Sequence, residues 1–162
     1  MTIGMRVGIG YDIHRLEEGR RLIMGGIEIP HERGLVGHSD ADVVLHAVTD
    51  AVLGAAGLSD IGELFPDTDD RFRDADSREL LAAAMEHVRE AGFAVNNVDV
   101  IIHAERPRMS PYKKPIAASI AALLGVPPEG VNVKAKTNEG MGPLGYADAI
   151  ACTAAALVVR LP

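Results

Sequence analysis

Two side chains that can bind a metal ion stand two residues apart near the start of the chain. Asp12 and His14 lie in a stretch with strand-like alternation, so both side chains would leave the same face of a strand. His46 lies on the polar face of a segment with helical spacing and could complete a set of two imidazoles and one carboxylate. Such a set suits Zn²⁺ with an open position or non-haem Fe(II). The alternative is a chance spacing, with His46 an ordinary surface histidine.

Two carboxylates lie one helical turn on either side of His46. Asp42 and Asp50 could each accept a hydrogen bond from the imidazole and orient it, or could form a solvated acidic stripe. Residues 38–40, with the sequence HSD, come directly before the expected helix. A helix N-terminus that carries an imidazole and a hydroxyl would hold a phosphate well, although the same residues could simply cap the helix.

Two further segments carry groups that suit a hydroxylated or phosphorylated ligand. The acidic stretch 60–76 is expected to be a loop and could contact polyol hydroxyls through Asp60 or Asp67, or be solvated. The turn at 103–111 offers backbone amides and Arg108 to a base or a phosphate, or is a turn shaped by proline.

A third segment joins a cation, a hydroxyl and a carboxylate at the expected end of a strand. Lys136, Thr137 and Glu139 precede a glycine-rich loop, and these groups suit phosphate and Mg²⁺. The chain as a whole is acidic, with a formal charge of −7 and an isoelectric point near 5.3. This balance opposes a nucleic-acid partner. An acidic chain can bind an anionic small molecule only where metal ions or local hydrogen-bond donors offset the negative electrostatic field of the protein.

The elements that must position these residues alternate between strand and helix patterns. Period-2 and apolar runs predict strands, and 3.6-residue spacing predicts three helices. The order favours an α/β (α+β) two-layer sandwich, with one mixed sheet and three helices on one of its faces. The bare sheet face would then need a partner. The expected strands are 5–14, a short pair within 21–30, 97–104, 131–137 and 146–161, and the expected helices are 40–57, 76–92 and 110–125.

Capping residues predict where the helices begin and end. Ser39 or Asp40 is expected to cap the first helix, and Gly57 to stop it. Ser110 and Pro111 are expected to cap and open the third helix.

The length of 162 residues favours one domain over residues 1–162, with residues 1–4 as a tail. The start of the chain does not resemble a signal peptide. The longest apolar run, 149–159, is shorter than the ~20 residues that span a bilayer. The short run leads us to expect no membrane partner. Cys152 has no second cysteine to pair with, so we expect a reducing, cytoplasmic setting.

Taken together, these segments resemble the 2-C-methyl-D-erythritol 2,4-cyclodiphosphate synthase family. The resemblance runs from about Met5 to the C-terminus and is most specific in HSDADVVLHAVTDAVLGAA (38–56) and DIGELFPDTD (60–69). It implies a homotrimer with sheets toward the threefold axis and active sites at subunit interfaces. It also implies a phosphorus–oxygen lyase of the non-mevalonate isoprenoid route. Its CDP-linked substrate, 4-diphosphocytidyl-2-C-methyl-D-erythritol 2-phosphate, closes to the cyclic diphosphate and releases CMP.

The same resemblance implies roles for individual residues. Asp12, His14 and His46 correspond to zinc ligands, and Glu139 corresponds to a ligand of a second divalent ion, Mg²⁺ or Mn²⁺. Two catalytic positions, credited with steadying the transition state, are His38 and Thr137. The implied substrate contacts are Asp12, His14, His38, Ser39, Asp60, Ile61, Gly62, Phe65, Pro66, Asp67, Thr68, Asp69, Ala104, Arg108, Met109, Ser110, Lys136, Thr137, Asn138, Glu139 and Tyr146.

The chain departs from some family members at three positions, and two other functions stay open. Pro143 and Tyr146 replace an aromatic residue and an arginine of an anion site along the trimer axis, and Lys136 stands where a hydroxyl residue can occur. One rival function is another metal enzyme, such as an Fe(II) oxygenase or a phosphohydrolase. The other is a metal-binding or metabolite-sensing trimer. A second metal ligand at Glu139 beside a base pocket favours the synthase over both.

Overall fold

The computed structural model describes residues 4–66 and 68–162, so the expected contact Asp67 and residues 1–3 lie outside it. A five-stranded mixed sheet forms one layer, with the strand order β4-β1-β7-β5-β6. Neighbouring strands are antiparallel except for β5 and β6, which are parallel. The strands are β1 (Met5–Glu18), β4 (Arg33–Leu35), β5 (Phe93–His103), β6 (Val131–Lys136) and β7 (Ala149–Arg160).

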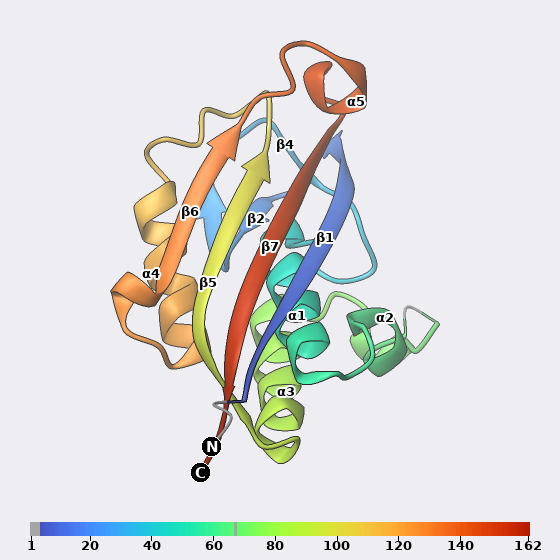
Figure 1. Ribbon diagram of the computed structural model, residues 1–162. Coiled ribbons are helices and arrows are strands. Elements are labelled where there is room, and N and C mark those ends of the chain that lie inside the picture. The colour runs from blue at the N-terminus through green and yellow to red at the C-terminus, as the bar shows by residue number, and fades with distance from the viewer. Residues whose placement is uncertain (1–3, 67) are drawn as a thin grey trace.

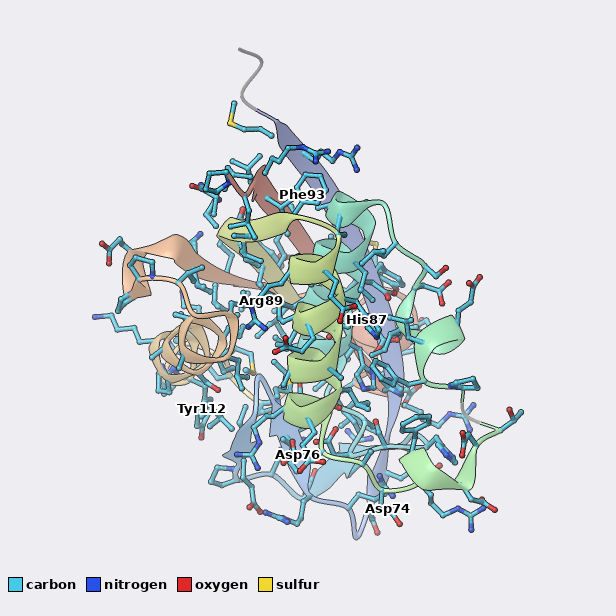
Figure 2. All side chains as sticks on the ribbon, turned by 90° about the horizontal axis from the view of Figure 1, so that it is seen from below. Asp74, Asp76, His87, Arg89, Phe93 and Tyr112 are labelled. Atoms are coloured by element: carbon cyan, nitrogen blue, oxygen red, sulfur yellow. The ribbon has the colours of Figure 1, made fainter. Side chains whose placement is uncertain are left out.

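Three helices cover one face of this sheet, as the sequence predicts (Figure 1). They are α1 (Val43–Ala56), α3 (Ser77–Glu90) and α4 (Lys113–Leu124). Figure 2 looks along the layers from below and shows α3 and α4 side by side on the same side of the sheet. The smaller elements are β2 (Leu22–Met24), β3 (Ile27–Ile29), α2 (Ile61–Leu64), η1 (Asp70–Phe72), η2 (Pro128–Gly130) and α5 (Gly142–Gly145).

The start of α1 differs from the prediction. The cap is Asp42, whose carboxylate accepts hydrogen bonds from the backbone N–H of Val44 (3.1 Å) and of Leu45 (3.0 Å). Neither Ser39 nor Asp40 caps the helix, because the backbone at Ala41 has a positive φ of 57° and interrupts the helical path. The helix ends at Gly57 in the left-handed conformation, as predicted.

The start of α4 also differs, and part of the acidic loop is helical. A hydrogen-bonded turn from Met109 to Tyr112 comes before α4, so the helix begins after Tyr112 with no side-chain cap, and Ser110 does not cap it. The stretch 60–76, expected to be a loop, contains the short helical turns α2 and η1.

The helix α1 is more deeply buried than an amphipathic pattern suggests. Asp42, expected beside His46 as a partner of the imidazole or as part of a solvated stripe, is fully buried, and so is Thr49. The Thr49 hydroxyl donates to the carbonyl oxygen of Leu45 (2.7 Å), which satisfies its hydrogen-bonding need without water. The sheet lies against one side of α1 and α3 against another, so α1 forms the centre of the core.

Two glycines of β1 allow α1 to lie directly on the strand. A Cβ at Gly10 would be 1.9 Å from the carbonyl oxygen of Ala47, and one at Gly8 would be 2.1 Å from a carbonyl oxygen one turn further along. Because side chains alternate along a strand, the next positions on this face are Asp12 and His14. The close approach therefore brings both side chains to the N-terminal half of α1.

Figure 1 shows the opposite face of the sheet free of the three helices. On this face β1 carries a row of large apolar side chains that are exposed. The exposed fractions are 57% for Met5, 72% for Val7, 73% for Ile9, 56% for Tyr11 and 44% for Ile13. A row of this length is typical of an interaction surface. Among the described residues, none of the helices has the length and apolar character to cross a membrane.

Candidate active site

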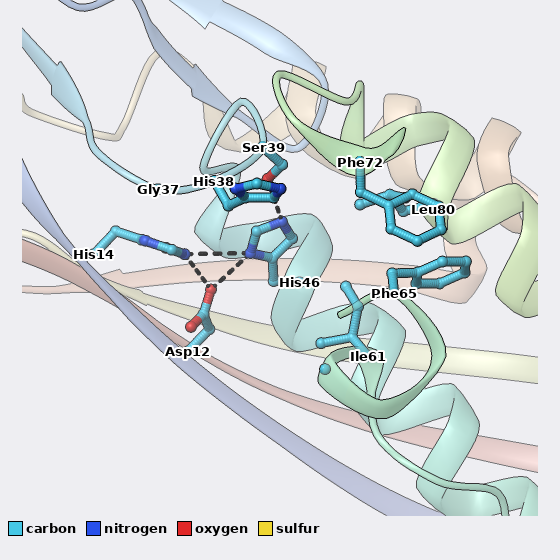
Figure 3. Close-up of a pocket in the computed structure, with 11 residues that line it drawn as sticks. Asp12, His14, Gly37, His38, Ser39, His46, Ile61, Phe65, Phe72 and Leu80 are labelled. Atoms are coloured by element: carbon cyan, nitrogen blue, oxygen red, sulfur yellow. Dashed lines mark hydrogen bonds and ion pairs between the residues drawn. The ribbon is translucent and has the colours of Figure 1, made fainter. Parts of the chain in front are cut away.

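Asp12, His14 and His46 converge where β1 meets α1 (Figure 3). The Asp12 Oδ2 atom lies 2.8 Å from His14 Nε2 and 3.0 Å from His46 Nδ1, and these two nitrogens lie 3.2 Å apart. In a tetrahedral site with Zn–N bonds of about 2.0–2.1 Å, ligand atoms lie about 3.3 Å apart. The three atoms therefore form a triangle close to the size that a small divalent ion requires.

The far nitrogen of each imidazole has a fixed partner. His14 Nδ1 lies 2.8 Å from the carbonyl oxygen of Val36, and because a carbonyl only accepts, this nitrogen carries the proton. His46 Nε2 lies 2.9 Å from the Ser77 hydroxyl and 3.1 Å from the Ser39 hydroxyl. The nitrogens that face Asp12, His14 Nε2 and His46 Nδ1, are therefore the ones directed at a shared metal position.

The expectation that Asp42 or Asp50 orients His46 is wrong. Besides capping α1, Asp42 accepts from the backbone N–H of Gly25 (2.8 Å) and of Gly26 (2.6 Å), which fastens the turn between β2 and β3 to the helix. Burial raises the pKa of Asp42 to about 6, although the backbone hydrogen bonds act in the other direction. The half-buried Asp50 accepts from the N–H of Ile61 at the start of α2 (2.8 Å).

The carboxylate and the imidazoles shift one another's protonation. Burial of Asp12 acts to raise its pKa, but hydrogen bonds and charge from His14 and His46 outweigh burial and lower it to about 2. Burial acts to lower the pKa of His14, but the hydrogen bond and charge of Asp12 outweigh it, so this pKa lies above 6.5. In the metal-free protein the cluster thus holds a proton that a metal ion must displace.

We expect metal affinity at this cluster to depend steeply on pH. Below the raised pKa of His14, each pH unit should weaken binding roughly tenfold, because a metal ion and a proton compete for one nitrogen. Without metal, the Asp12–His14 pair should stabilise the fold at pH values between the ordinary Asp pKa of 3.8 and the ordinary His pKa of 6.5. This contribution is lost as the pH rises through the His14 pKa or falls through about 2.

Competition with a chelator at several pH values between about 5 and 8 measures this dependence. The midpoint of thermal unfolding of the metal-free protein, followed over the same range, should fall as the pH rises above 6.5, whereas metal affinity should rise. A metal affinity that stays constant over this range would contradict the assignment of His14 as a ligand.

The cluster opens into a cavity of about 490 Å³ between β1, α1 and α2. The imidazole of His38 and the hydroxyl of Ser39 lie above the cluster, and the wall opposite is apolar (Figure 3). In that wall the rings of Phe65 and Phe72 meet edge to face, with centroids 5.4 Å apart. Polar groups beside the cluster and an apolar wall suit a small organic phosphate. The lining residues are Asp12, His14, Gly37, His38, Ser39, His46, Ile61, Gly62, Phe65, Phe72 and Leu80.

Gly37, Phe72 and Leu80 line the cavity but are absent from the residues expected from sequence. Phe72 could have been predicted as a lining residue, because an aromatic side chain within an acidic stretch is expected to be buried against other apolar groups. Some expected contacts lie beside the cavity without lining it, namely Asp60, Pro66, Thr68 and Asp69. Asp60 caps α2 by accepting from the N–H of Glu63 (2.9 Å), and the Asp69 carbonyl oxygen lies 3.4 Å from His38 Nε2.

The remaining expected contacts form a second group at the ends of β5 and β6. The backbone N–H of Ala104 donates to the carbonyl of Lys136 (2.9 Å), and that of Asn138 donates to the Glu105 carboxylate (3.1 Å). Since β7 and β5 lie between β1 and β6, three spacings of ~4.8 Å place the strands about 14 Å apart. None of these residues lines the cavity: Ala104, Arg108, Met109, Ser110, Lys136, Thr137, Asn138, Glu139 and Tyr146.

The fold and the cluster define a small α/β protein with three side chains beside a cavity that could hold a metal ion. Residues 5–159 match the model of the YgbB family, and the chain belongs to that family.

Individual relatives match the chain along nearly its whole length. A 2-C-methyl-D-erythritol 2,4-cyclodiphosphate synthase of Bordetella avium is 58% identical over 160 residues, which are 99% of each chain. The structure of IspF of Plasmodium falciparum in complex with CDP is 33% identical, with a TM-score of 0.86 and all of both chains covered. The bifunctional IspDF of Campylobacter jejuni is 40% identical with a TM-score of 0.95, over 99% of this chain and 43% of that one.

Proposed function

We propose that the chain catalyses the closure of 4-diphosphocytidyl-2-C-methyl-D-erythritol 2-phosphate to 2-C-methyl-D-erythritol 2,4-cyclodiphosphate, with release of CMP. This reaction belongs to non-mevalonate isoprenoid biosynthesis and makes the chain a phosphorus–oxygen lyase. The main support is the triangle of Asp12, His14 and His46 below His38 and Ser39 in one cavity. The synthase name of the Bordetella avium relative and the CDP bound to the Plasmodium falciparum relative agree with this reaction.

Two divalent ions fit the residues present. Asp12, His14 and His46 would hold Zn²⁺ through one carboxylate oxygen and two nitrogens, a usual donor set for this ion. The exposed carboxylate of Glu139 would provide a ligand for Mg²⁺ or Mn²⁺. When bound, such ions polarise a phosphate and draw negative charge toward the departing group. The residues of the zinc cluster contribute one negative charge, which leaves the occupied cluster cationic and attractive to phosphate.

Catalysis by the chain's own residues consists mainly of positioning. An oxygen of the 2-phosphate forms a bond to the β-phosphorus, the bond from that phosphorus to the bridging oxygen breaks, and CMP leaves with the electron pair. The 2-phosphate is ionised near neutral pH, so no side chain has to remove a proton. His38 and Ser39 would orient the phosphate above the cluster. Ile61 and Phe65 would cover the carbon skeleton and exclude water.

The nucleotide would bind to a neighbouring subunit. No residue of 104–110 or 136–138 lines the cavity of its own chain, yet hydrogen bonds hold the two segments together as one surface. Backbone groups of 104–110 suit a cytosine base, and the side chains of Lys136 and Thr137 suit its phosphates. Thr137 would also steady the transition state, together with His38 of the neighbouring cavity.

A homotrimer would cover the apolar face of β1. Val7 and Ile9 are each more than 70% exposed, and burying such side chains stabilises an assembly by about 1.5–3 kcal/mol each. Three sheets facing a common axis would bury this face and leave the helices outside. The free Cys152 supports a reducing compartment, the cytoplasm, as the place of action.

The proposed reaction is tested by ³¹P NMR of the protein with the CDP-methylerythritol phosphate, first with Zn²⁺ and Mg²⁺ and then with a chelator. The synthase predicts metal-dependent appearance of a cyclic diphosphate together with CMP. Free phosphate would indicate a hydrolase, and binding without turnover by a metal-loaded trimer would indicate a sensing module. Either result would overturn the proposal.

A Glu139→Ala variant should retain Zn²⁺ and lose most of the cyclisation rate when Mg²⁺ is limiting. The reason is that Glu139 neither belongs to the zinc cluster nor lines its cavity, and its carboxylate would be a ligand of the second ion. Initial rates over a Mg²⁺ titration measure the effect. Glu129→Ala, which removes an exposed carboxylate at the other end of β6, is the matched control. Equal Mg²⁺ dependence in both variants would exclude a role for Glu139.

A further inference from the structure

Behind His46, on the side away from the metal cluster, hydrogen bonds continue into the interior. His46 Nε2 lies 2.9 Å from the Ser77 hydroxyl, and this hydroxyl lies in short hydrogen-bonding contact with Asp40 Oδ1. Ser77 is fully buried at the start of α3, and Asp40 lies in the turn before α1. Three groups from separate parts of the chain therefore form one continuous line that ends at a metal-facing imidazole.

The direction of each hydrogen bond follows from the groups involved. A carboxylate only accepts, so the Ser77 O–H donates to Asp40. The lone pairs of the Ser77 hydroxyl then accept, so His46 donates through Nε2–H. A neutral imidazole carries one proton, which leaves Nδ1 unprotonated and directed at Asp12 (3.0 Å).

The acceptor at the end of the line is itself held in place. Asp40 accepts from the backbone N–H of Ser77 (3.1 Å) and from that of Asp42 (3.1 Å). Its carboxylate therefore cannot turn away from the Ser77 hydroxyl without breaking backbone hydrogen bonds.

We propose that Ser77 and Asp40 are positioning residues that fix the tautomer and ring orientation of His46 and so select Nδ1 as the metal ligand. The inference rests on the metal cluster proposed above but not on the reaction. Neither residue lines the cavity, so both act through His46. Ser39, the second hydroxyl near His46 Nε2, does line the cavity and is available to a substrate, whereas Ser77 is enclosed. Ser77 thus remains the partner of His46 when Ser39 binds a ligand.

Metal affinity of the purified protein tests the proposal without any turnover. Ser77→Ala should weaken Zn²⁺ and Co²⁺ binding by about 10- to 100-fold in chelator competition, the usual effect of losing a partner of a ligand. Ser77→Thr, which keeps the hydroxyl, should restore most of the affinity. Thr49→Val, which removes a buried hydroxyl bonded only within α1, should change nothing. Equal affinity of the alanine variant and wild type would overturn the proposal.

A double-mutant cycle tests whether Asp40 acts on His46 through the Ser77 hydroxyl, an arrangement called the relay below, or whether the two residues have independent structural effects. If Asp40 acts through the Ser77 hydroxyl, Asp40→Asn should lower metal affinity in the wild type and have little effect in the Ser77→Ala background. Equal losses in both backgrounds would overturn the proposal. Asp40→Asn keeps the shape of the carboxylate and leaves the Ser77 hydroxyl in place, so its metal affinity tests the proposal even if Ser77→Ala does not fold, and an affinity equal to that of the wild type would overturn it.

A spectroscopic signature reports the imidazole directly. In the zinc-loaded protein with ¹⁵N-labelled histidine, His46 should show a slowly exchanging Nε2–H and a metal-bound Nδ1, and Ser77→Ala should speed the exchange. A metal-bound Nε2 would overturn the proposal. If the wild type binds metal as described but forms no cyclic diphosphate, the proposed reaction fails while the relay stands.

Discussion

A His46→Ala variant will bind Zn²⁺ about 100- to 1,000-fold more weakly than the wild type and will not cyclise the substrate at micromolar Zn²⁺. Zinc sites with four ligands bind with about 10–16 kcal/mol, or about 2.5–4 kcal/mol a ligand, and 1.4 kcal/mol is a tenfold change. Only Asp12 and His14 remain to hold the ion. Metal content after dialysis and chelator competition measure the loss of binding, and ³¹P NMR measures the loss of cyclisation.

The folded state should survive this substitution. The His46 side chain is 12% exposed at the edge of the cavity, so alanine leaves a gap that water can enter. The oligomer measured by sedimentation should match the wild type. His87→Ala is the control, because His87 is an exposed histidine on the outer side of α3. A His46→Ala protein with full zinc content and normal turnover would refute the metal assignment.

The second large effect concerns the contact between β1 and α1. Gly10→Val should lower the free energy of unfolding by about 4 kcal/mol or more, and the midpoint of thermal unfolding by about 8–16 °C, or prevent folding altogether. A Cβ at this position overlaps the Ala47 carbonyl oxygen at 1.9 Å, and neither backbone can move without separating the helix from the sheet. The zinc affinity of any folded fraction should also fall, because β1 carries Asp12 and α1 carries His46.

The matched control for this prediction lies on the same helix. Gly54 is exposed within α1, and a Cβ there meets no atom within 4 Å. Gly54→Ala should therefore stabilise the protein by about 0.5–1 kcal/mol, since alanine favours helix over glycine. Urea or thermal unfolding of both variants decides the matter. Equal stability of Gly10→Val and wild type would show that α1 does not rest on the strand.

The layers of the fold could be predicted from sequence because each element carries a local pattern. Alternation along 5–14 and 131–137 indicated strands, and glycines at the ends of helices indicated where they stop. The alanine-rich segment 149–160 folds as β7, as predicted. The caps of α1 and α4 could not be predicted, because Ala41 has a positive φ and a tight turn at 109–112 shifts the first helical residue.

The metal cluster could be predicted for the same local reason, and its surroundings could not. The Asp12–His14 spacing determines that both side chains share a face, whatever the rest of the fold does. The partner of His46 is Ser77, 31 residues away, and it meets the imidazole only because α3 packs on α1. The nearby carboxylates Asp42 and Asp50 were the wrong choice, since each satisfies backbone N–H groups instead.

The one cysteine of the chain gives this fold an internal reporter. Cys152 pairs with Asp12 across β7 and β1, is fully buried, and burial raises the pKa of its thiol, with Asp42 and Asp12 adding to the effect. A thiol held protonated and out of contact with solvent does not react with alkylating reagents in the native state. Alkylation then proceeds only as fast as the sheet opens locally, so its rate records the motion of the strand that carries the metal ligands.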